Sequence, residues 1–295
     1  METALNSRNE SVFSAGDHST TKVSEGSVIQ KNNGDAASSN ENTTIDLGSL
    51  KSSTTNCRSS DWWKSYVPSH FIIAKAPPTI RYIPDFITPE EEKQLMVEIY
   101  NVPKPKWQKL LNRRLQNWGG IVGKKALISD NNMAPWLTNV IDRIMLFGDG
   151  FPAERRPNHV LINEYLAGQG IMFQAHTDGP AFYPLIATVS LGTDAFLDYY
   201  KPIDPEKQEE TKRQRYIGSL HVKPRSLLLV SDEMYTKYLH EIDERMVDEV
   251  HELVFNHDVT GSSVGETIPR GLRISLTIRN VIKVSKNDLA RLIYR

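Results

Sequence analysis

The segment His159–Tyr165 (HVLINEY) is the first of the short apolar stretches that decide the fold of this chain. Comparable stretches follow at residues 186–191 (IATVSL), 195–200 (AFLDYY), 218–222 (GSLHV), 226–230 (SLLLV) and 272–281 (LRISLTIRNV). Each is short enough for a strand, and turn-forming residues separate several of them. Many short strands in succession predict a β-sandwich or a jelly roll.

Two helices are expected before these strands. Thr88 has the character of an N-cap, Pro89 suits the first helical position, and three glutamates fill the first turn. This helix should continue to about Tyr100, and a second one should span residues 134–147. Residues 76–86 suggest a short strand between prolines, whereas residues 117–120 (NWGG) resemble a loop. The predicted class is α+β, mostly β with flanking helices.

The composition excludes several classes of protein. The 295 residues carry 35 Lys and Arg against 36 Asp and Glu, and this near balance excludes a uniformly basic nucleic-acid coat. The single cysteine, Cys57, excludes a disulfide framework and a cysteine-based zinc finger. No apolar run approaches the roughly 18 residues of a membrane span, and the N-terminus does not resemble a secretory signal. We therefore expect a soluble intracellular protein without a membrane partner.

Residues 1–60 differ in composition from the rest of the chain. They contain 27 Ser, Thr or Asn residues but no Pro, Trp or Tyr, which predicts a disordered tail. The expected organisation is this tail, an N-terminal extension with a substrate-recognition lid at 61–155, a catalytic core at 156–284 and a C-terminal tail at 285–295.

The lid prediction rests on residues 101–129, which contain no acidic residue. This segment carries the bases Lys104, Lys106, Lys109, Arg113, Arg114, Lys124 and Lys125, with Trp107 and Trp118 among them. Bases interleaved with aromatic rings suit phosphate attraction and base stacking. A solvated helix face with two core tryptophans explains the composition equally well.

The motif His176-Thr177-Asp178 is the first candidate for chemistry. On an extended segment, residues two apart project to the same side, so His176 and Asp178 can ligate one ion. Two histidines with one carboxylate and open positions are typical of non-haem Fe(II). The available second histidines are His221, His240, His251 and His257, and His251-Glu252 lacks the further histidine of a zinc protease. We choose His240, which follows the strand expected at residues 226–230. A surface turn with a hydrogen-bonded histidine is the alternative.

The segment Arg273–Arg279 (RISLTIR) is the second candidate. Alternation places Arg273, Ser275, Thr277 and Arg279 on one face of a strand, with apolar residues on the other. Two guanidinium groups and two hydroxyls on one face predict an anion site, since arginine binds carboxylates bidentately. An ordinary solvated outer strand is the alternative.

Taken in order, these residues resemble the AlkB family of Fe(II)/2-oxoglutarate dioxygenases. The resemblance covers about residues 72–283 and is closest to the branch of the sixth eukaryotic homologue, on motifs such as residues 103–107 (PKPKW) and 115–120 (LQNWGG). It implies a double-stranded β-helix, the cofactor Fe(II), and the co-substrates 2-oxoglutarate and O₂. It assigns iron to His176, Asp178 and His240, and 2-oxoglutarate to Asn163, Tyr165, Arg273, Ser275 and Arg279. Arg273 would bind the distal carboxylate, with Ser275 and Arg279 near the keto-acid end.

The chain departs from the family pattern at two places. Residues 173–175 make the segment before His176 two residues longer than in the sixth-homologue branch. Glu241 stands where a glycine usually follows the second histidine, and Arg273 comes 33 residues after His240, with residues 259–270 forming an inserted loop.

The resemblance implies oxidative demethylation of a methylated nucleobase in RNA or single-stranded DNA, with RNA favoured. Lys104, Lys106, Trp107, Arg113, Arg114 and Trp118 are the expected substrate contacts. The alternatives are a protein-directed hydroxylase or demethylase, and a nucleic-acid reader with impaired catalysis. We expect a monomer in nucleus and cytoplasm, with residues 212–215 (KRQR) as a weak nuclear-import candidate.

Overall fold

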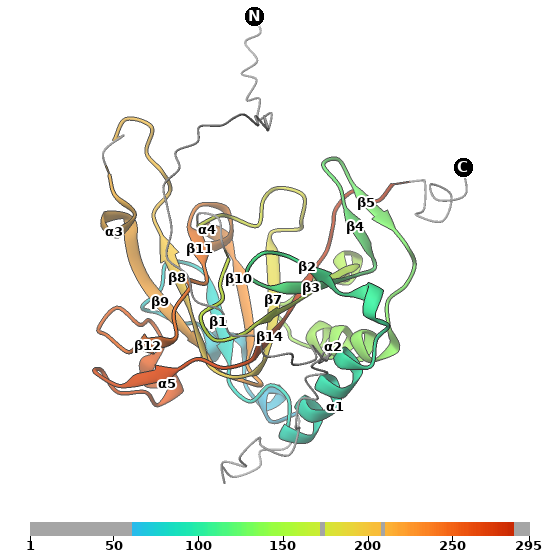
Figure 1. Cartoon of the computed structure of the whole chain (residues 1–295), viewed down its shortest axis with the longest axis horizontal. Helices are drawn as coiled ribbons and strands as arrows, with labels where there is room; N and C mark the ends of the chain where they lie inside the picture. Colours follow the sequence, from blue (N-terminus) through green and yellow to red (C-terminus); the bar gives the residue numbers. More distant parts are fainter. Residues whose placement is uncertain (1–60, 172–174, 208–209, 286–295) are drawn as a thin grey trace, which may run out of the picture. The chain divides into compact units, whose positions relative to one another are not determined.

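Seven antiparallel strands form the major sheet of the protein (Figure 1). The computed structural model describes residues 61–171, 175–207 and 210–285. The expected tails, at 1–60 and at the C-terminus beyond 285, and residues 172–174 before His176 lie outside the described residues. The strand order of the major sheet is β1 (Ile80–Ile83), β10 (Leu227–Ser231), β7 (Leu185–Gly192), β14 (Arg273–Arg279), β6 (His159–Tyr165), β3 (Arg114–Trp118) and β2 (Gln108–Lys109).

A minor sheet of three strands supplies the second layer of the sandwich. Its order is β11 (Leu239–Glu241), β8 (Ala195–Tyr200) and β9 (Tyr216–Val222), again antiparallel. Two two-stranded antiparallel sheets complete the β-structure, formed by β4 (Gly120–Val122) with β5 (Leu127–Ser129) and by β12 (Val247–Glu249) with β13 (Thr267–Pro269). The prediction of a mostly β jelly roll with flanking helices is confirmed.

Two helices cover the outer face of the major sheet (Figure 1). They are α1 (Pro89–Tyr100) and α2 (Pro135–Met145). The predicted start of α1 is confirmed, because the Thr88 side chain accepts a hydrogen bond from the amide of Glu91, whose carboxylate accepts one from the amide of Thr88.

The remaining helices are short. They are α3 (Lys212–Arg215), α4 (Asp232–Thr236), α5 (His257–Thr260) and the 3₁₀ turns η2 (Trp62–Ser65), η3 (Pro68–Phe71), η4 (Lys104–Lys106) and η5 (Ala153–Arg155). The helix α5 overlaps the start of the segment 259–270 that was expected to be an inserted loop, and β13 lies within that segment.

The alternation predicted for Arg273–Arg279 is confirmed in β14. Ile274, Leu276 and Ile278 are each 0% exposed and belong to the main hydrophobic core beneath α1 and α2. The strand pairs with β6 on one side and β7 on the other, so it is central in the sheet and not a solvated outer strand. Its polar side chains therefore face the space between the two sheets.

Residues 117–120 are the clearest difference from the sequence prediction. Asn117 and Trp118 end β3, and Gly120 begins β4, so a sharp corner replaces the expected loop. Gly119 has a φ of 84°, and a Cβ there would lie 2.2 Å from the carbonyl oxygen of Asn158. The glycine therefore allows a close backbone approach that other residues would block.

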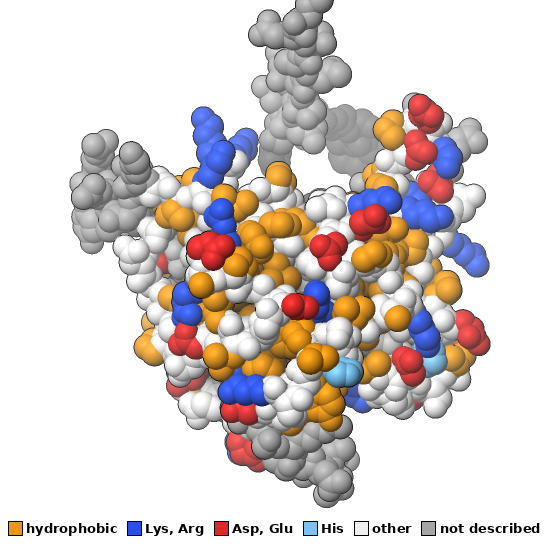
Figure 2. Space-filling view, turned by 180° about the vertical axis from the view of Figure 1, so that it is seen from behind, with side chains coloured by type: hydrophobic (Ala, Val, Ile, Leu, Met, Phe, Trp, Pro, Cys, Tyr) orange, Lys and Arg blue, Asp and Glu red, His pale blue; other side chains and the backbone are white. Residues whose placement is uncertain are grey.

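The sheet crosses the domain boundary expected between residues 155 and 156. Strands β1, β2 and β3 come from the N-terminal side, yet β1 pairs with β10 and β3 pairs with β6. Among the described residues, no helix has the length and apolar character needed to cross a bilayer. Figure 2 shows basic and acidic side chains interspersed on one face of the molecule.

Candidate active site

His176 and His240 are brought together by an isolated antiparallel bridge. The amide of His176 donates to the carbonyl of His240 at 3.1 Å, and the reverse hydrogen bond measures 2.9 Å. The centroids of the two imidazole rings are 4.9 Å apart. Because residues paired in this way share a face, two histidines that are distant in the sequence point into the same space.

Asp178 completes this group of side chains. One carboxylate oxygen lies 3.8 Å from Nε2 of His240, and the other accepts from the guanidinium of Arg279 at 3.4 Å. A second nitrogen of Arg279 lies 3.4 Å from Nδ1 of His159, and the guanidinium carbon is 4.3 Å from the centroid of the Phe182 ring. Arg279 therefore fixes Asp178 from the major sheet.

A cavity of about 140 Å³ lies between the two sheets at this point. Its wall on the major sheet includes Asn163, Tyr165, Thr188, Arg273, Ser275, Thr277 and Arg279. Its wall on the minor sheet includes Leu197, Tyr199, Val222 and His240, while His176 and Asp178 border it from the segment after β6. The three predicted metal ligands and the five predicted 2-oxoglutarate residues thus line one cavity.

Arg273 is the strongest indication that the cavity accepts an anion. Its side chain is buried, one nitrogen donates to Ser190 at 3.1 Å, and Nε and Nη1 have no partner among the described residues. Burial lowers the pKa of Arg273 to about 10. A carboxylate in the cavity would satisfy both donors and restore the stability of the charged form.

The side chains around Arg273 suit the same ligand. Tyr165 lies beside it, with the guanidinium carbon 5.8 Å from the ring centroid. Asn163 and Ser275 are opposite each other on neighbouring strands, and both are almost fully buried. Burial raises the pKa of Tyr165, so its hydroxyl stays a donor at neutral pH.

Of the six predicted substrate residues, only Arg113 lines the cavity. It lies in the turn between β2 and β3, and its Nε donates to the side-chain oxygen of Asn163 at 3.2 Å. This contact links the predicted lid to a predicted 2-oxoglutarate residue.

The other lid residues make contacts within the protein. Trp118 is buried in the core, with Nζ of Lys106 4.1 Å from its ring centroid. The guanidinium of Arg114 lies 4.2 Å from the ring centroid of Trp107 and forms two hydrogen bonds to Glu164, at 2.5 and 2.8 Å. Lys104 is exposed. Both tryptophans therefore have a cation on one ring face.

Glu241, which stands where the family usually has a glycine after the second histidine, points away from the cavity. On β11 it pairs with Asp198 of β8, and together with Asp243 the two acids bring three carboxylates close together. Glu241 accepts from the hydroxyl of Tyr200 at 2.8 Å and pairs with Lys212, while Asp198 pairs with Arg245 at 2.6 Å. The acids are therefore already balanced by protein donors.

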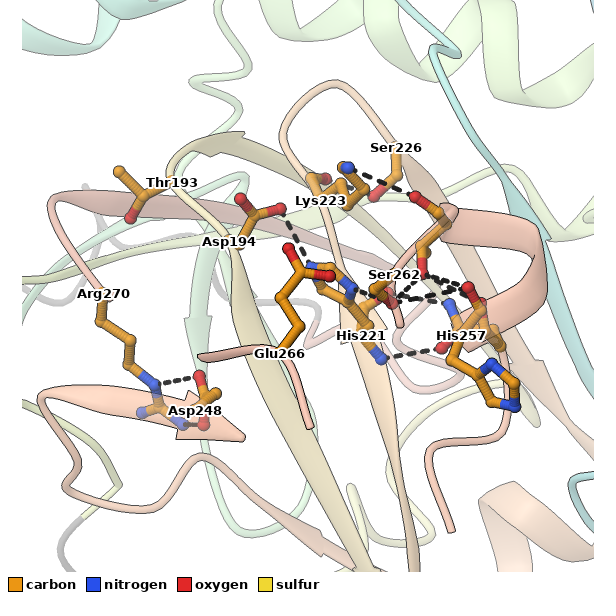
Figure 3. Close-up of polar contacts among 12 residues, drawn as sticks. Thr193, Asp194, His221, Lys223, Ser226, Asp248, His257, Ser262, Glu266 and Arg270 are labelled. Atoms are coloured by element: carbon orange, nitrogen blue, oxygen red, sulfur yellow. Dashed lines mark hydrogen bonds and ion pairs between the residues drawn. The ribbon is translucent and has the colours of Figure 1, made fainter. Parts of the chain in front are cut away.

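A second polar group lies on the outer face of β8 and β9 (Figure 3). We call it the outer cluster, and it comprises Asp194, His221, Asp248, Asn256, Ser262 and Arg270. The ring nitrogens of His221 lie 3.1 Å (Nε2) from a carboxylate oxygen of Asp194 and 3.4 Å (Nδ1) from the hydroxyl of Ser262. The backbone of His221 also forms two hydrogen bonds of 2.8 Å with the side-chain amide of Asn256. Arg270 forms two hydrogen bonds to Asp248, at 2.5 and 2.7 Å. The inserted segment 259–270 is anchored by these contacts.

The chain matches the family model of the 2OG-Fe(II) oxygenase superfamily over residues 97–279. With its two histidines, one carboxylate and buried anion-binding arginine around one cavity, the protein belongs to this superfamily of 2-oxoglutarate-dependent dioxygenases.

Among curated proteins, the chain is 42% identical over 221 residues to the "Probable RNA/DNA demethylase ALKBH6" of Danio rerio, a match that covers 74% of this chain and 92% of that protein. It is 31% identical to uncharacterized protein L905 of Acanthamoeba polyphaga mimivirus, over 68% of this chain and 84% of that one. The structure of OsALKBH1 aligns over 70% of this chain and 99% of that chain, with 11% identity and a TM-score of 0.46. The predicted AlkB resemblance is confirmed.

The residues present fit the cofactors of the superfamily, which are Fe(II), 2-oxoglutarate and O₂. Two imidazoles and a carboxylate are the ligand set of a non-haem Fe(II) centre. The unpartnered guanidinium of Arg273 matches the anionic co-substrate. When bound, iron with 2-oxoglutarate and O₂ supplies the oxidation of a C–H bond, while 2-oxoglutarate becomes succinate and CO₂.

The sequence prediction missed Tyr199, which lines the cavity from the minor sheet. Alternation along Ala195–Tyr200 places Leu197 and Tyr199 on one face, and this signal was available in the sequence. It was not informative alone, because only the pairing of β8 with β11 shows that this face meets His240.

Proposed function

We propose that the protein oxidatively demethylates a methylated nucleobase in single-stranded nucleic acid, with RNA favoured over DNA. The main support for this proposal is that His176, Asp178 and His240 line one cavity. Three arginines line the same cavity, namely Arg113, Arg273 and Arg279. The relative named as an RNA/DNA demethylase supports the same substrate class. A narrow cavity between sheets suits a base taken out of the stack.

In this proposal each residue has a defined role. His176, Asp178 and His240 hold Fe(II), and Arg279 orients Asp178 through its 3.4 Å contact. Arg273 binds the distal carboxylate of 2-oxoglutarate, with Asn163, Tyr165 and Ser275 around the co-substrate. Oxidation of an N-methyl carbon gives an N-hydroxymethyl group, which releases formaldehyde and leaves the unmethylated nitrogen.

The test is a turnover screen with methylated RNA oligonucleotides, matched DNA oligonucleotides and methylated peptides. We expect succinate release together with loss of a methyl group from RNA, measured by mass spectrometry, and neither with Asp178→Ala. Turnover of peptides alone would favour the protein-directed alternative. A folded, iron-containing protein that releases no succinate with any of them would favour a reader.

We propose that Arg113 and Lys104 contribute the electrostatic part of nucleic-acid binding. Arg114 and Lys106 are poor choices for mutation, because they pair with Glu164 and Trp118. The variant Lys104→Ala/Arg113→Ala should weaken RNA binding and lower its salt dependence, by a slope of about 1 to 2 for two lost phosphate contacts. The exposed lysines Lys64 and Lys93, replaced together by alanine, provide the matched control. An unchanged salt slope in the lid variant would contradict this role.

We also propose that the protein acts as a monomer in nucleus and cytoplasm. The support for nuclear entry is limited to the basic segment Lys212–Arg215, which forms α3. Imaging of a fluorescent fusion with and without Arg213→Ala/Arg215→Ala, and light scattering of the purified protein, test these two points. Exclusion from the nucleus or a dimer in solution would contradict them.

A further inference from the structure

The hydroxyl of Tyr199 is a buried donor that the assignments above do not use. Tyr199 is 0% exposed, and its hydroxyl has no hydrogen-bond partner among the described residues. Buried hydroxyls without partners are rare, because removal from water costs free energy that a hydrogen bond normally recovers. The group therefore points to a ligand.

The other buried tyrosines nearby show the ordinary arrangement. The hydroxyl of Tyr200, the next residue of β8, donates to Glu241 at 2.8 Å on the opposite face of the strand. The hydroxyl of Tyr235 donates to the carbonyl of Gly179, and that of Tyr82 accepts from the amide of Lys223. The outer cluster likewise has protein partners (Figure 3).

The position of Tyr199 identifies the part of the cavity that its hydroxyl serves. Tyr199 is directly opposite His240 in the β8–β11 ladder, and the two ring centroids are 6.1 Å apart. Tyr199 therefore lines the cavity beside His240, which itself lies 3.8 Å from Asp178.

We propose that the Tyr199 hydroxyl donates a hydrogen bond to the keto oxygen of 2-oxoglutarate. The proposal rests on the assignment of the cavity to this co-substrate, whose distal carboxylate is given to Arg273. Arg273 and Tyr199 come from opposite sheets. The minor sheet then adds a contact to a ligand whose distal carboxylate is held from the major sheet, and a ligand that lacks the keto oxygen loses the contact from Tyr199.

The experiment compares Tyr199→Phe with Tyr200→Phe, which removes the same atom from the neighbouring residue but from the other face of β8. Calorimetry measures binding of 2-oxoglutarate and of glutarate, which lacks the keto group, to protein loaded with Mn(II). We expect Tyr199→Phe to weaken 2-oxoglutarate binding about tenfold or more and to leave glutarate binding unchanged. Tyr200→Phe should bind both ligands as the wild type does.

Thermal unfolding of the metal-free proteins provides a readout independent of ligand. Tyr199→Phe should be at least as stable as the wild type, because it loses an unsatisfied hydroxyl, whereas Tyr200→Phe should be less stable because Glu241 loses a donor.

The proposal would be overturned if Tyr199→Phe bound 2-oxoglutarate with wild-type affinity. This holds even if the variant showed a higher KM for a methylated oligonucleotide. Equal weakening of both ligands would overturn the assignment to the keto oxygen. A wild-type protein that binds no 2-oxoglutarate would overturn the co-substrate assignment of the cavity as well.

Discussion

The two faces of the minor sheet differ in whether their buried polar side chains have hydrogen-bond partners. On the outer face, the side chains of His221, Asn256 and Arg270 all have protein partners. On the cavity face, the hydroxyl of Tyr199 has no hydrogen-bond partner among the described residues. The same is true of two nitrogens of Arg273, which faces the cavity from the major sheet. Satisfied groups hold the fold together, whereas the unsatisfied donors that line the cavity are available to a ligand. Substitutions on the two faces should therefore separate stability from function.

The largest expected effect is on turnover. Asp178→Ala removes one of three proposed iron ligands and should reduce succinate formation by at least about a hundredfold, together with a loss of bound iron. Asp194→Ala, which removes a carboxylate from the outer cluster, should retain both. Iron content measured by mass spectrometry and succinate release would show the contrast, and normal iron content in Asp178→Ala would exclude that residue as a ligand.

The largest expected loss of stability comes from the outer cluster. Asp248→Ala leaves the buried guanidinium of Arg270 without its two carboxylate hydrogen bonds. Such a loss typically lowers the free energy of unfolding by about 3–5 kcal/mol. Urea unfolding measures it, and 2-oxoglutarate affinity should not change in the fraction that remains folded. A loss below about 1 kcal/mol would show that the pair is not a structural anchor.

The pH dependence of stability should report on His159. Burial, followed by the nearby charge of Arg279, lowers the pKa of His159 to about 3. The unfolded chain therefore binds a proton near pH 6.5 that the folded protein excludes, and stability is lost as the pH falls below 6.5. Between pH 7 and pH 4.5 this loss should be about 2 kcal/mol larger in the wild type than in His159→Asn. Equal losses in urea unfolding would mean that His159 is not held neutral.

An effect of similar size to that of His159, but on ligand affinity, is expected from Arg273. Arg273→Ala should weaken 2-oxoglutarate binding about tenfold to a hundredfold, since a charged hydrogen-bonding group is lost. The metal-free protein should not be less stable, because the removed guanidinium is buried and poorly satisfied. Arg273→Lys tests geometry separately, because it keeps the charge without the planar fork. Lower stability with unchanged affinity would assign Arg273 to the scaffold.

The sequence predicts the local parts of this molecule well. The α1 start depends on Thr88 and its neighbours, and the faces of β14 depend on strict alternation, so both follow from short-range chemistry. The burial of Trp118 and the pairing of Arg114 with Glu164 do not, because both depend on the register of β3 against β6. A segment rich in bases and tryptophans has the same composition whether its side chains face solvent or each other.

The site was predictable from sequence only through the resemblance to a family. Neither the choice of His240 over His251 nor the joint position of Asn163 and Arg273 follows from spacing alone. The structure supplies what is missing, the bridge between His176 and His240 and the pairing of β14 with β6. Both join segments that are distant along the chain, and long-range pairing is not encoded in any local pattern.

The continuity of the β2–β3 segment with the major sheet also has a kinetic consequence. Arg114–Trp118 pairs with β6 along its whole length, and Arg113, in the turn just before this strand, contacts Asn163. Moving the strand as a flap would break a ladder of backbone hydrogen bonds that is part of the core sheet. This side of the cavity is therefore a fixed frame to which a substrate must adapt. For the proposed nucleic-acid substrate, association rates should then depend on how often the nucleotide leaves its stack. Amide exchange in β3 should be as slow as in β6.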